Sequence, residues 1–337
     1  MSLSPSPPPP PSRSRYAWCY SNQTNGAGTY PHQFYVDTDY FIATQPTDPQ
    51  TDFVDQGWWG QRDHCKVTGQ VKGTIPFPHA WVGGLEGGNN AAAVLLPDNE
   101  TLLQFQPLYR CEPGSPVLSM EWGLTQPWAN VSILSDGIMG AHGGSHLSSI
   151  GGTVRRGELN ATAGPIRHAL KLMLWAKEYY FPGNASVPCW RWPADHCDGT
   201  WNASRDPANP NYYNGTNPNL KPGALLAVPP PFAGAIAPLL HTHVGSKVLA
   251  ALRDYGGYLD DNTASDSGAF NVEIGVADEV EEEYKAEGVS LRNAGQSTNL
   301  FEDLVLIYQN LHIVQNNGPD HVGGGGTPLA PLAPPIC

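Results

Sequence analysis

The sequence predicts a mainly β domain of the sandwich or jelly-roll kind, with two or so helices, long disulfide-stapled loops and an extended N-terminal arm. Three features of the composition predict this fold class. The 337 residues include 37 Gly and 33 Pro, which make turns, and 10 Trp and 14 Tyr, which pack well on pleated sheets. Charged residues are only 15% of the chain, against roughly 25% in a typical soluble domain. Apolar residues, at 40%, suffice for a large core.

The chain divides into a proline-rich arm, residues 1–15, and a single large β-rich domain, residues 16–337. The arm contains an uninterrupted run of five prolines, which lack backbone N–H donors and favour an extended polyproline II rod. No apolar segment typical of a secretion signal precedes this run. Either the true N-terminus lies upstream of Met1 or the protein is secreted by another route, and we favour the first.

Alternation of apolar residues predicts strands in the first half of the domain. Residues 32–44 predict one or two strands, and residues 74–110 predict a β-meander with a hairpin tip at Asp98-Asn99-Glu100. The glycines of residues 137–159 predict a compact loop, because they disfavour a helix. Residues 165–180 fit both a helical and an alternating period, and we interpret them as a strand.

The second half alternates irregular and periodic segments. Residues 183–222 are polar and rich in Asn and Pro, which predicts a long irregular loop. Residues 223–230 predict a buried strand, and residues 244–257 a helix that Gly256 ends. Residues 269–276 predict a strand, and residues 299–315 a helix that turns into a strand.

Charge and hydropathy exclude two classes of partner. The net charge of −13 opposes binding to nucleic acid, whose phosphates the protein would repel. No stretch approaches the roughly 20 consecutive apolar residues of a membrane span, so we expect no membrane insertion. We also expect no cofactor. Copies of the protein itself and glycans are the expected partners.

The number of cysteines is even, which in a secreted protein predicts three disulfides. Cys189 and Cys197 are close enough in sequence to close a local loop, and the pairing of the others is open. No C-x-x-C pair is present, so metal binding by cysteine is not expected. The six cysteines are Cys19, Cys65, Cys111, Cys189, Cys197 and Cys337.

Seven Asn-x-Ser/Thr sequons predict an extracellular, heavily N-glycosylated protein, because such sites are used only in the secretory pathway and on exposed loops. They are Asn22, Asn99, Asn130, Asn160, Asn184, Asn202 and Asn214.

The opening SPSPPPPPS resembles the hydroxyproline-rich modules of algal and plant wall glycoproteins such as extensins and pherophorins. That resemblance covers about fifteen residues. It implies that the prolines of the run are hydroxylated and carry O-linked arabinose. The prolines concerned are Pro7, Pro8, Pro9, Pro10 and Pro11.

The body resembles a group of secreted, functionally uncharacterised proteins from bacteria and microbial eukaryotes. The resemblance is carried by GGTVRRGEL (151–159), IRHALK (166–171), LRDYGGYLDD (252–261) and NNGPDHVGGGGTPLAPLAPP (316–335), and covers most of residues 74–336. It implies a shared fold and supplies no catalytic residues.

Glu158, His142 and His168 are the candidates for acid–base chemistry. The Gly-rich loop would present His142, and Glu158 ends it. A glycan-cleaving enzyme needs two carboxyl groups roughly 5–10 Å apart. Asp195, Asp260 or Glu86 could supply the second one beside Glu158. The alternative is that Glu158 pairs with a neighbouring arginine and has a purely structural role.

Other patterns give weaker indications. The spacing of His142 and His146 suits zinc only on a helix, which the glycines between them disfavour. His241-x-His243 lies among proline and apolar residues that favour a loop. We therefore predict no metal site at either pair. Ser145 does not lie in a G-x-S-x-G motif. The acidic run 278–283 lacks the spacing of a calcium loop and is interpreted as a solvated helix start.

Trp190 and Trp192 lie in the long irregular loop and are candidates for glycan contact, since aromatic faces stack on sugar rings. Ordinary core packing is the alternative for both.

Two functions follow. We favour a secreted, heavily glycosylated structural protein of an extracellular matrix, wall or filament, which assembles head to tail through its proline-rich arm rather than acting as an enzyme. The alternative is a secreted carbohydrate-active enzyme or glycan-binding module that uses the Gly-rich loop around His142 and Glu158.

Overall fold

The computed structural model describes residues 33–56, 64–85, 89–120, 131–135, 139–198 and 212–325, and the backbone of the short strand β1 (Trp18–Tyr20). Several residues singled out above lie outside this part of the chain, or, for Cys19, have no described side chain. They are Pro7 to Pro11, Cys19, Asn22, Glu86, Asn130, Asn202 and Cys337.

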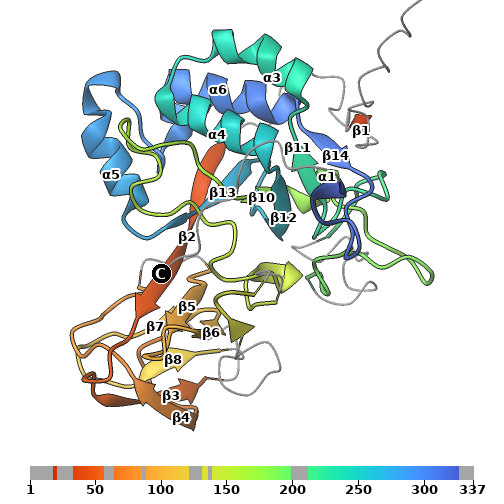
Figure 1. Ribbon diagram of the computed structural model, residues 1–337. Helices are drawn as coiled ribbons and strands as arrows, with labels where there is room; N and C mark the ends of the chain where they lie inside the picture. Colours follow the sequence, from red (N-terminus) through yellow and green to blue (C-terminus); the bar gives the residue numbers. More distant parts are fainter. Residues whose placement is uncertain are drawn as a thin grey trace, which may run out of the picture.

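A large mixed sheet runs through the whole molecule (Figure 1), with the strand order β1-β14-β11-β12-β10-β13-β2-β5-β6-β9. Its strands pair in parallel between β10 and β12, β13 and β2, and β2 and β5. Besides β1, they are β2 (Phe34–Ala43), β5 (Ala92–Leu95), β6 (Thr101–Phe105), β9 (Val131–Ser132), β10 (Leu170–Leu174), β11 (Leu225–Ala227), β12 (Gly257–Asn262), β13 (Gly268–Glu273) and β14 (His312–Val314).

Helices cover one face of this sheet in what we call the helical half, at the top of Figure 1. Alternate residues of β10, Leu170, Leu172 and Leu174, point into a core shared with the helices. Helix α4 begins after Thr242, whose hydroxyl accepts a hydrogen bond from Gly245 N, as an N-cap should. The helices are α1 (Ala176–Tyr179), α3 (Pro230–Ile236), α4 (His243–Asp254), α5 (Val276–Glu283) and α6 (Thr298–Gln309).

A four-stranded sheet packs on the other part of the large sheet and makes the sandwich half, at the bottom of Figure 1. Its order is β4-β3-β8-β7, from β3 (Gln50–Asp55), β4 (Gln70–Pro76), β7 (Leu108–Tyr109) and β8 (Val117–Ser119). Tyr40 and Ile42 of β2 and Phe105 of β6 share one buried cluster with Phe53 of β3. Two sheets therefore face each other here, as in a sandwich.

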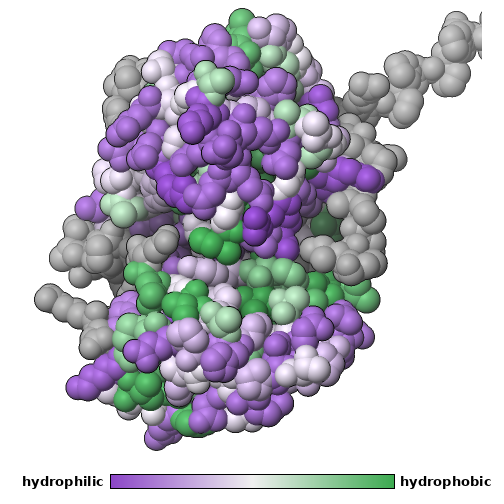
Figure 2. Space-filling view, turned by 90° about the vertical axis from the view of Figure 1, so that its left-hand side faces the viewer, coloured by the Kyte–Doolittle hydropathy of each residue, from purple (hydrophilic) through white to green (hydrophobic). Residues whose placement is uncertain are grey.

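The surface differs between the two halves. On the face in Figure 2, hydrophobic side chains gather in a band across the sandwich half, whereas the helical half is mostly hydrophilic. The large hydrophobic side chains that the sandwich half exposes include Val67, Val71, Val82 and Leu85.

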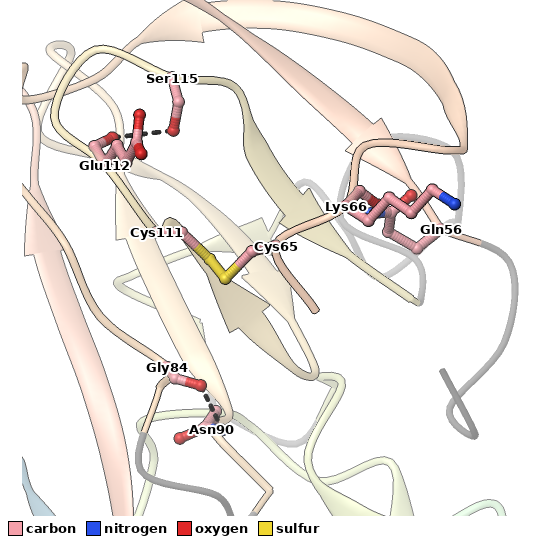
Figure 3. Close-up of a disulfide and its surroundings, with 8 residues drawn as sticks. All are labelled: Gln56, Cys65, Lys66, Gly84, Asn90, Cys111, Glu112 and Ser115. Atoms are coloured by element: carbon pink, nitrogen blue, oxygen red, sulfur yellow. Dashed lines mark hydrogen bonds between the residues drawn. A yellow bond between two sulfur atoms is a disulfide. The ribbon is translucent and has the colours of Figure 1, made fainter. Parts of the chain in front are cut away.

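Two disulfides are present among the described residues. Cys65–Cys111 links two loops of the sandwich half (Figure 3), and Cys189–Cys197 closes the local loop that the sequence predicts. Near the first, the Asn90 amide donates to Gly84 O at 3.3 Å. The pairing of Cys189 with Cys197 is confirmed. The third predicted bridge would use Cys19 and Cys337, whose side chains lie outside the described residues.

The prediction of a sheet-rich fold with disulfide-stapled loops is confirmed, and a jelly-roll in particular is not. Three pairs of neighbouring strands in the large sheet are parallel, and helices rather than a second sheet cover the helical half. The prediction of two or so helices was too low, because α3, α5 and the short α1 join the two expected ones, α4 and α6. No helix in the described part of the chain is long and apolar enough to cross a membrane.

Candidate active site

Strand β2 passes through both halves and carries two aspartates where they meet. Phe34 contributes to the core of the helical half and Tyr40 to that of the sandwich half. Side chains alternate along a strand, so Asp37 and Asp39 both point away from the face of the sheet that Phe34 and Tyr40 occupy. Asp39 is fully buried there, and 13% of the Asp37 side chain is exposed.

The first part of the Gly-rich loop, described from residue 139 to the point where it rejoins the sheet at residue 154, covers the two aspartates. It contains a single 3₁₀ turn, Gly143–Ser145, and it returns to the sheet where Val154 pairs in parallel with Val272 of β13. Lys171 N donates to Gly152 O at 2.9 Å, which ties the loop to β10. The prediction of a compact non-helical loop is confirmed.

His142, a residue of this loop, is fully buried, with both ring nitrogens against carboxylates. Its Nδ1 contacts Asp260 Oδ2, and its Nε2 lies 3.1 Å from Asp39 Oδ1 and 3.5 Å from Asp37 Oδ2. Burial alone would lower the pKa of His142, but the charges of Asp260 and Asp39 raise it well above its usual value. The imidazole is therefore a buried cation.

Lys171, on β10, is the second buried cation. Its Nζ lies 2.9 Å from Asp39 Oδ2 and donates to Ser148 O at 3.0 Å. Thr153 Oγ1 also donates to Asp39. Burial would raise the pKa of Asp39, but Lys171 and His142 outweigh it and lower that pKa to about 2. This network is closed, since every charge in it faces an opposite one.

A β-bulge brings two consecutive aspartates of β12 to the same place. The pairing with β10 runs from Leu172 with Leu259 to Met173 with Asp261, so that Asp260 is the extra residue. In a regular strand Asp260 and Asp261 would point to opposite faces, and a bulge re-aims one of them. As a result, Asp260 meets His142 while Asp261 faces the Gly-rich loop.

Asn89 joins Asp261 to Asp37. Its amide nitrogen lies 3.0 Å from Asp37 Oδ2 and 2.8 Å from Asp261 Oδ2. Because both bonds meet at one nitrogen, the two carboxylate oxygens are no more than about 6 Å apart, a limit that admits the roughly 5–5.5 Å carboxyl separation of retaining glycosidases. Asp261 is 8% exposed, and burial, ahead of its neighbours' charges, raises its pKa to about 6.

Two consecutive glycines let the loop approach these carboxyls. Gly143 has a φ of 54°, and a Cβ added there would lie 2.5 Å from Asp261 Oδ2. A Cβ on Gly144 would lie 2.4 Å from Asp198 Oδ1. Gly144 N donates to Asp261 Oδ1 at 3.3 Å. The site therefore requires the absence of side chains at both positions.

Two histidines lie beside the glycines. His146 Nδ1 is 3.1 Å from Asp195 Oδ1, and its ring stacks on His196 with centroids 4.2 Å apart. His196 Nδ1 lies 3.0 Å from Gly144 O. Among the described residues, no group of three or more His, Cys, Asp or Glu side chains could hold a metal ion.

Of the three candidate catalytic residues, the structure brings Glu158 and His168 together and places His142 elsewhere. His168 Nε2 lies 3.1 Å from Glu158 Oε2, while its Nδ1 faces Ala169 O at 2.8 Å. Burial lowers the pKa of His168, but its hydrogen bond to Glu158 outweighs this and raises it. Lys247 of α4 donates to Glu158 O at 3.0 Å, so this ion pair lies toward the helices.

The remaining candidates lie as follows. Ser145 Oγ donates to Asp260 Oδ1 at 2.7 Å, so a carboxylate rather than an imidazole faces this hydroxyl. His241 is 3.6 Å from Glu302, and His243 is the first residue of α4. The acidic run forms α5, where Glu279 binds Arg156 at 2.7 Å, so it is more engaged than a solvated helix start.

The proposed glycan-contact and glycosylation residues are partly described. Trp190 is half-buried and packs against the main core, and Trp192 is half-buried. Asn99, Asn184 and Asn214 are exposed, whereas Asn160 is half-buried.

Sequence reasoning missed Asp37, Asn89, Asp198 and Asp261. Their positions are spread over more than 220 residues of sequence. Two consecutive aspartates, Asp260 and Asp261, follow a predicted strand and are the one local indication of the site. Only Asp260 is a candidate carboxyl in the sequence analysis.

Comparison with known proteins adds nothing to this geometry: no family model, no curated protein and no solved structure matches the chain. The resemblances to wall glycoproteins and to secreted proteins of unknown function therefore stay predictions.

Proposed function

We propose that the protein is a secreted carbohydrate-active hydrolase whose catalytic pair is Asp37 and Asp261. The observation that carries this proposal is the single amide of Asn89 that bridges the two carboxyl groups. The disulfides and the lack of a membrane-spanning helix among the described residues are compatible with an extracellular protein.

The two carboxyls differ in the way that glycosidic hydrolysis requires. Asp261, with its pKa raised to about 6, keeps a proton in mildly acidic solution and can give it to the leaving oxygen. Asp37 accepts hydrogen bonds from Thr38 N at 3.0 Å and from Asn89, and its Oδ2 lies 3.5 Å from His142 Nε2, so these three neighbours hold it in place as the nucleophile.

The proposed reaction has two steps. Asp37 attacks the anomeric carbon while Asp261 protonates the departing oxygen, so that the glycosidic bond breaks and a glycosyl ester forms. In the second step Asp261 takes a proton from water, and the resulting hydroxide displaces Asp37 from the sugar. The proton taken from water restores Asp261 to its starting form, and the product keeps its anomeric configuration.

The test measures reducing ends that the full-length secreted protein releases from xylan, β-glucan and mannan. We expect activity that falls as pH rises through about 6, because Asp261 then loses its proton. Asp37→Asn and Asp261→Asn should each lower the rate by at least about 100-fold. Glu158→Gln is the control, since Glu158 pairs with His168, and should leave the rate near that of the wild type.

Two outcomes would overturn the proposal. One is release of no reducing ends from any of the three polysaccharides. The other is activity that survives Asp37→Asn and Asp261→Asn but is lost in Glu158→Gln, which would return catalysis to the Glu158–His168 pair.

A structural glycoprotein of a matrix, wall or filament is the second candidate, and the exposed sequon asparagines favour it. Asn99 sits at the β5–β6 hairpin tip with a φ of 57°, and Asn184 and Asn214 also lie on exposed loops. Glycans at these positions would displace no core side chain.

For this second candidate we predict that the native protein forms filaments under the electron microscope and that a version without residues 1–15 does not. The physical reason is that a polyproline rod bound in a groove of a neighbouring copy makes a head-to-tail contact. Contacts of this kind that do not close into a ring give a filament. Single particles in both samples would contradict assembly through the arm.

A further inference from the structure

We propose that His146 and His196 form a clasp between two loops that flank the candidate site, and that this clasp opens in acid when both rings carry a charge. His146 belongs to the Gly-rich loop, and His196 to the loop closed by the Cys189–Cys197 disulfide, which we call the disulfide loop. The geometry of the clasp is independent of the function proposed above. Its consequence for catalysis rests on that function, because the clasp holds Gly144 beside Asp261.

Each histidine is hydrogen-bonded to the loop of the other one. His146 Nδ1 lies 3.1 Å from Asp195 Oδ1 in the disulfide loop, and His196 Nδ1 lies 3.0 Å from Gly144 O in the Gly-rich loop. A carboxylate and a carbonyl oxygen can only accept hydrogen bonds, so Nδ1 is the donor in both contacts. Each ring therefore takes up its second proton at Nε2.

The two rings also stack face to face. Their centroids are 4.2 Å apart, and their planes are inclined by 9°. Two neutral imidazoles, or one neutral and one charged, can pack in this way, but two imidazolium ions at this distance repel each other. The clasp therefore accepts one additional proton and resists a second one.

Asp195 is the acid that pairs with the clasp. Its side chain is 57% exposed, so solvent weakens its attraction for His146. Burial lowers the pKa of His146 and the charge on His196 lowers it further, while Asp195 offsets them only in part. One exposed carboxylate is thus too little to balance two imidazolium ions.

The acids around Gly144 do not make up the difference in mildly acidic solution. Asp261 Oδ1 accepts a hydrogen bond from Gly144 N, and a Cβ added to Gly144 would lie 2.4 Å from Asp198 Oδ1. Burial raises the pKa of both aspartates, so their negative charge is lost as pH falls. The carboxylate of Asp260 contacts the His142 cation instead.

Acid therefore favours the open form, because the closed clasp binds the second proton more weakly than separated rings do. Opening begins below the ordinary histidine pKa of about 6.5. It frees Gly144 O from His196 and lets the Gly-rich loop withdraw its Gly144 N–H from Asp261. For the proposed hydrolase this predicts a second limb of the pH profile, in which activity falls again in acid.

The test is a pH titration of the full secreted protein labelled with ¹⁵N in its histidine rings and followed by NMR. In the wild type we expect His146 and His196 to bind protons in two steps at least about one pH unit apart. In His196→Phe, which keeps a flat ring without a charge, His146 should titrate in one step, at higher pH than the second step of the wild type. His241→Phe is the control: that side chain is half-exposed and lies 3.6 Å from Glu302, so both steps should stay unchanged.

Amide hydrogen exchange reports whether the Gly-rich loop opens. Gly140 N donates to His146 O at 3.0 Å, and its exchange, corrected for the intrinsic effect of pH, should quicken about tenfold or more below the second step. In His196→Phe this increase with acid should be absent, whatever the protection at neutral pH.

A wild type in which the two rings titrate together as independent groups would overturn the inference, and so would two steps with no change in the exchange of Gly140. Both outcomes are read from the wild type, so they stand even where His196→Phe does not fold. The readouts need no substrate. Coupled titration and opening without hydrolysis would sink the proposed function and keep the clasp, and hydrolysis with independent histidines would do the reverse.

Discussion

Replacing Lys171 with methionine is expected to lower the free energy of unfolding by about 3–5 kcal/mol, the cost of leaving one partner of a buried ion pair uncompensated. The Lys171 side chain is 2% exposed and its ammonium lies 2.9 Å from Asp39, which has no exposed surface. Methionine fills the volume but leaves Asp39 with only His142 as a cationic partner. Urea denaturation of the secreted protein, followed by circular dichroism, measures the change.

The matched control is Lys72→Met. Lys72 lies 3.6 Å from Asp55, but both side chains are about one-third exposed, so we expect a loss of less than ~1 kcal/mol. Equal losses in the two variants would mean that the buried network contributes no more than a surface pair. Adding Asp39→Asn to Lys171→Met should recover part of the loss, because the unpaired charge is then removed.

The same network predicts how stability depends on acid. Asp39 has a pKa of about 2 in the folded protein, below the ordinary value of about 3.9. The folded state therefore binds its proton more weakly than the unfolded state. The stability that Asp39 contributes is complete above about pH 4 and is lost as pH falls toward 2. Lys171→Met should reduce this acid-dependent loss, since it removes the cation chiefly responsible for the shift.

The periodic parts of the fold could be predicted because their signal is local. Leu170, Leu172 and Leu174 alternate over five residues, and they form β10 as expected. Val244, Val248 and Leu252 repeat at helical spacing and form the buried side of α4. The parallel pairing that makes the sheet mixed depends instead on contacts between distant segments, such as Phe34 with Gly268, which no local period specifies.

The candidate site could be predicted only in part, for the same reason. The glycines around His142 indicate a tight loop, and that histidine is central to the buried network. Glu158 was grouped with it because they are close in sequence, yet the chain rejoins the sheet at Val154 and carries Glu158 toward α4. The bulge that turns Asp261 toward Asn89 leaves no mark in the sequence.

Asp261→Asn is expected to stabilise the protein at pH 8 by roughly 1–2 kcal/mol while it lowers the rate of hydrolysis by at least about 100-fold. Burial raises the pKa of Asp261 in the folded protein to about 6, above its value in the unfolded chain. At higher pH the buried negative charge therefore destabilises the folded state. Asparagine has no charge to bury. Its carbonyl oxygen can still accept the hydrogen bonds from Gly144 N and Asn262 N, but its NH2 group takes the place of Oδ2, so the hydrogen bond from Asn89 is lost and reduces the gain.

The sign of the effect depends on pH and can be checked by thermal unfolding at several pH values. The wild type gains stability as pH falls from about 6 to about 4, because folding then favours the protonated Asp261. The advantage of Asp261→Asn should therefore be largest above pH 6 and vanish below about pH 4. A constant difference in melting temperature over this range would show that the charge of Asp261 is not the cause.

Asp303→Asn provides a buried control with the opposite expected sign. The Asp303 carboxylate accepts hydrogen bonds from His241 N, Thr242 N and Thr242 Oγ1 just before α4, so replacing it should destabilise the protein by about 1 kcal/mol or more. Replacing a buried aspartate that has a structural role should lower stability in this way. Replacing a catalytic aspartate should raise stability, since active sites hold charges in unfavourable places. If Asp261→Asn lowers the melting temperature at pH 8 as Asp303→Asn does, Asp261 is a structural residue and not the proton donor.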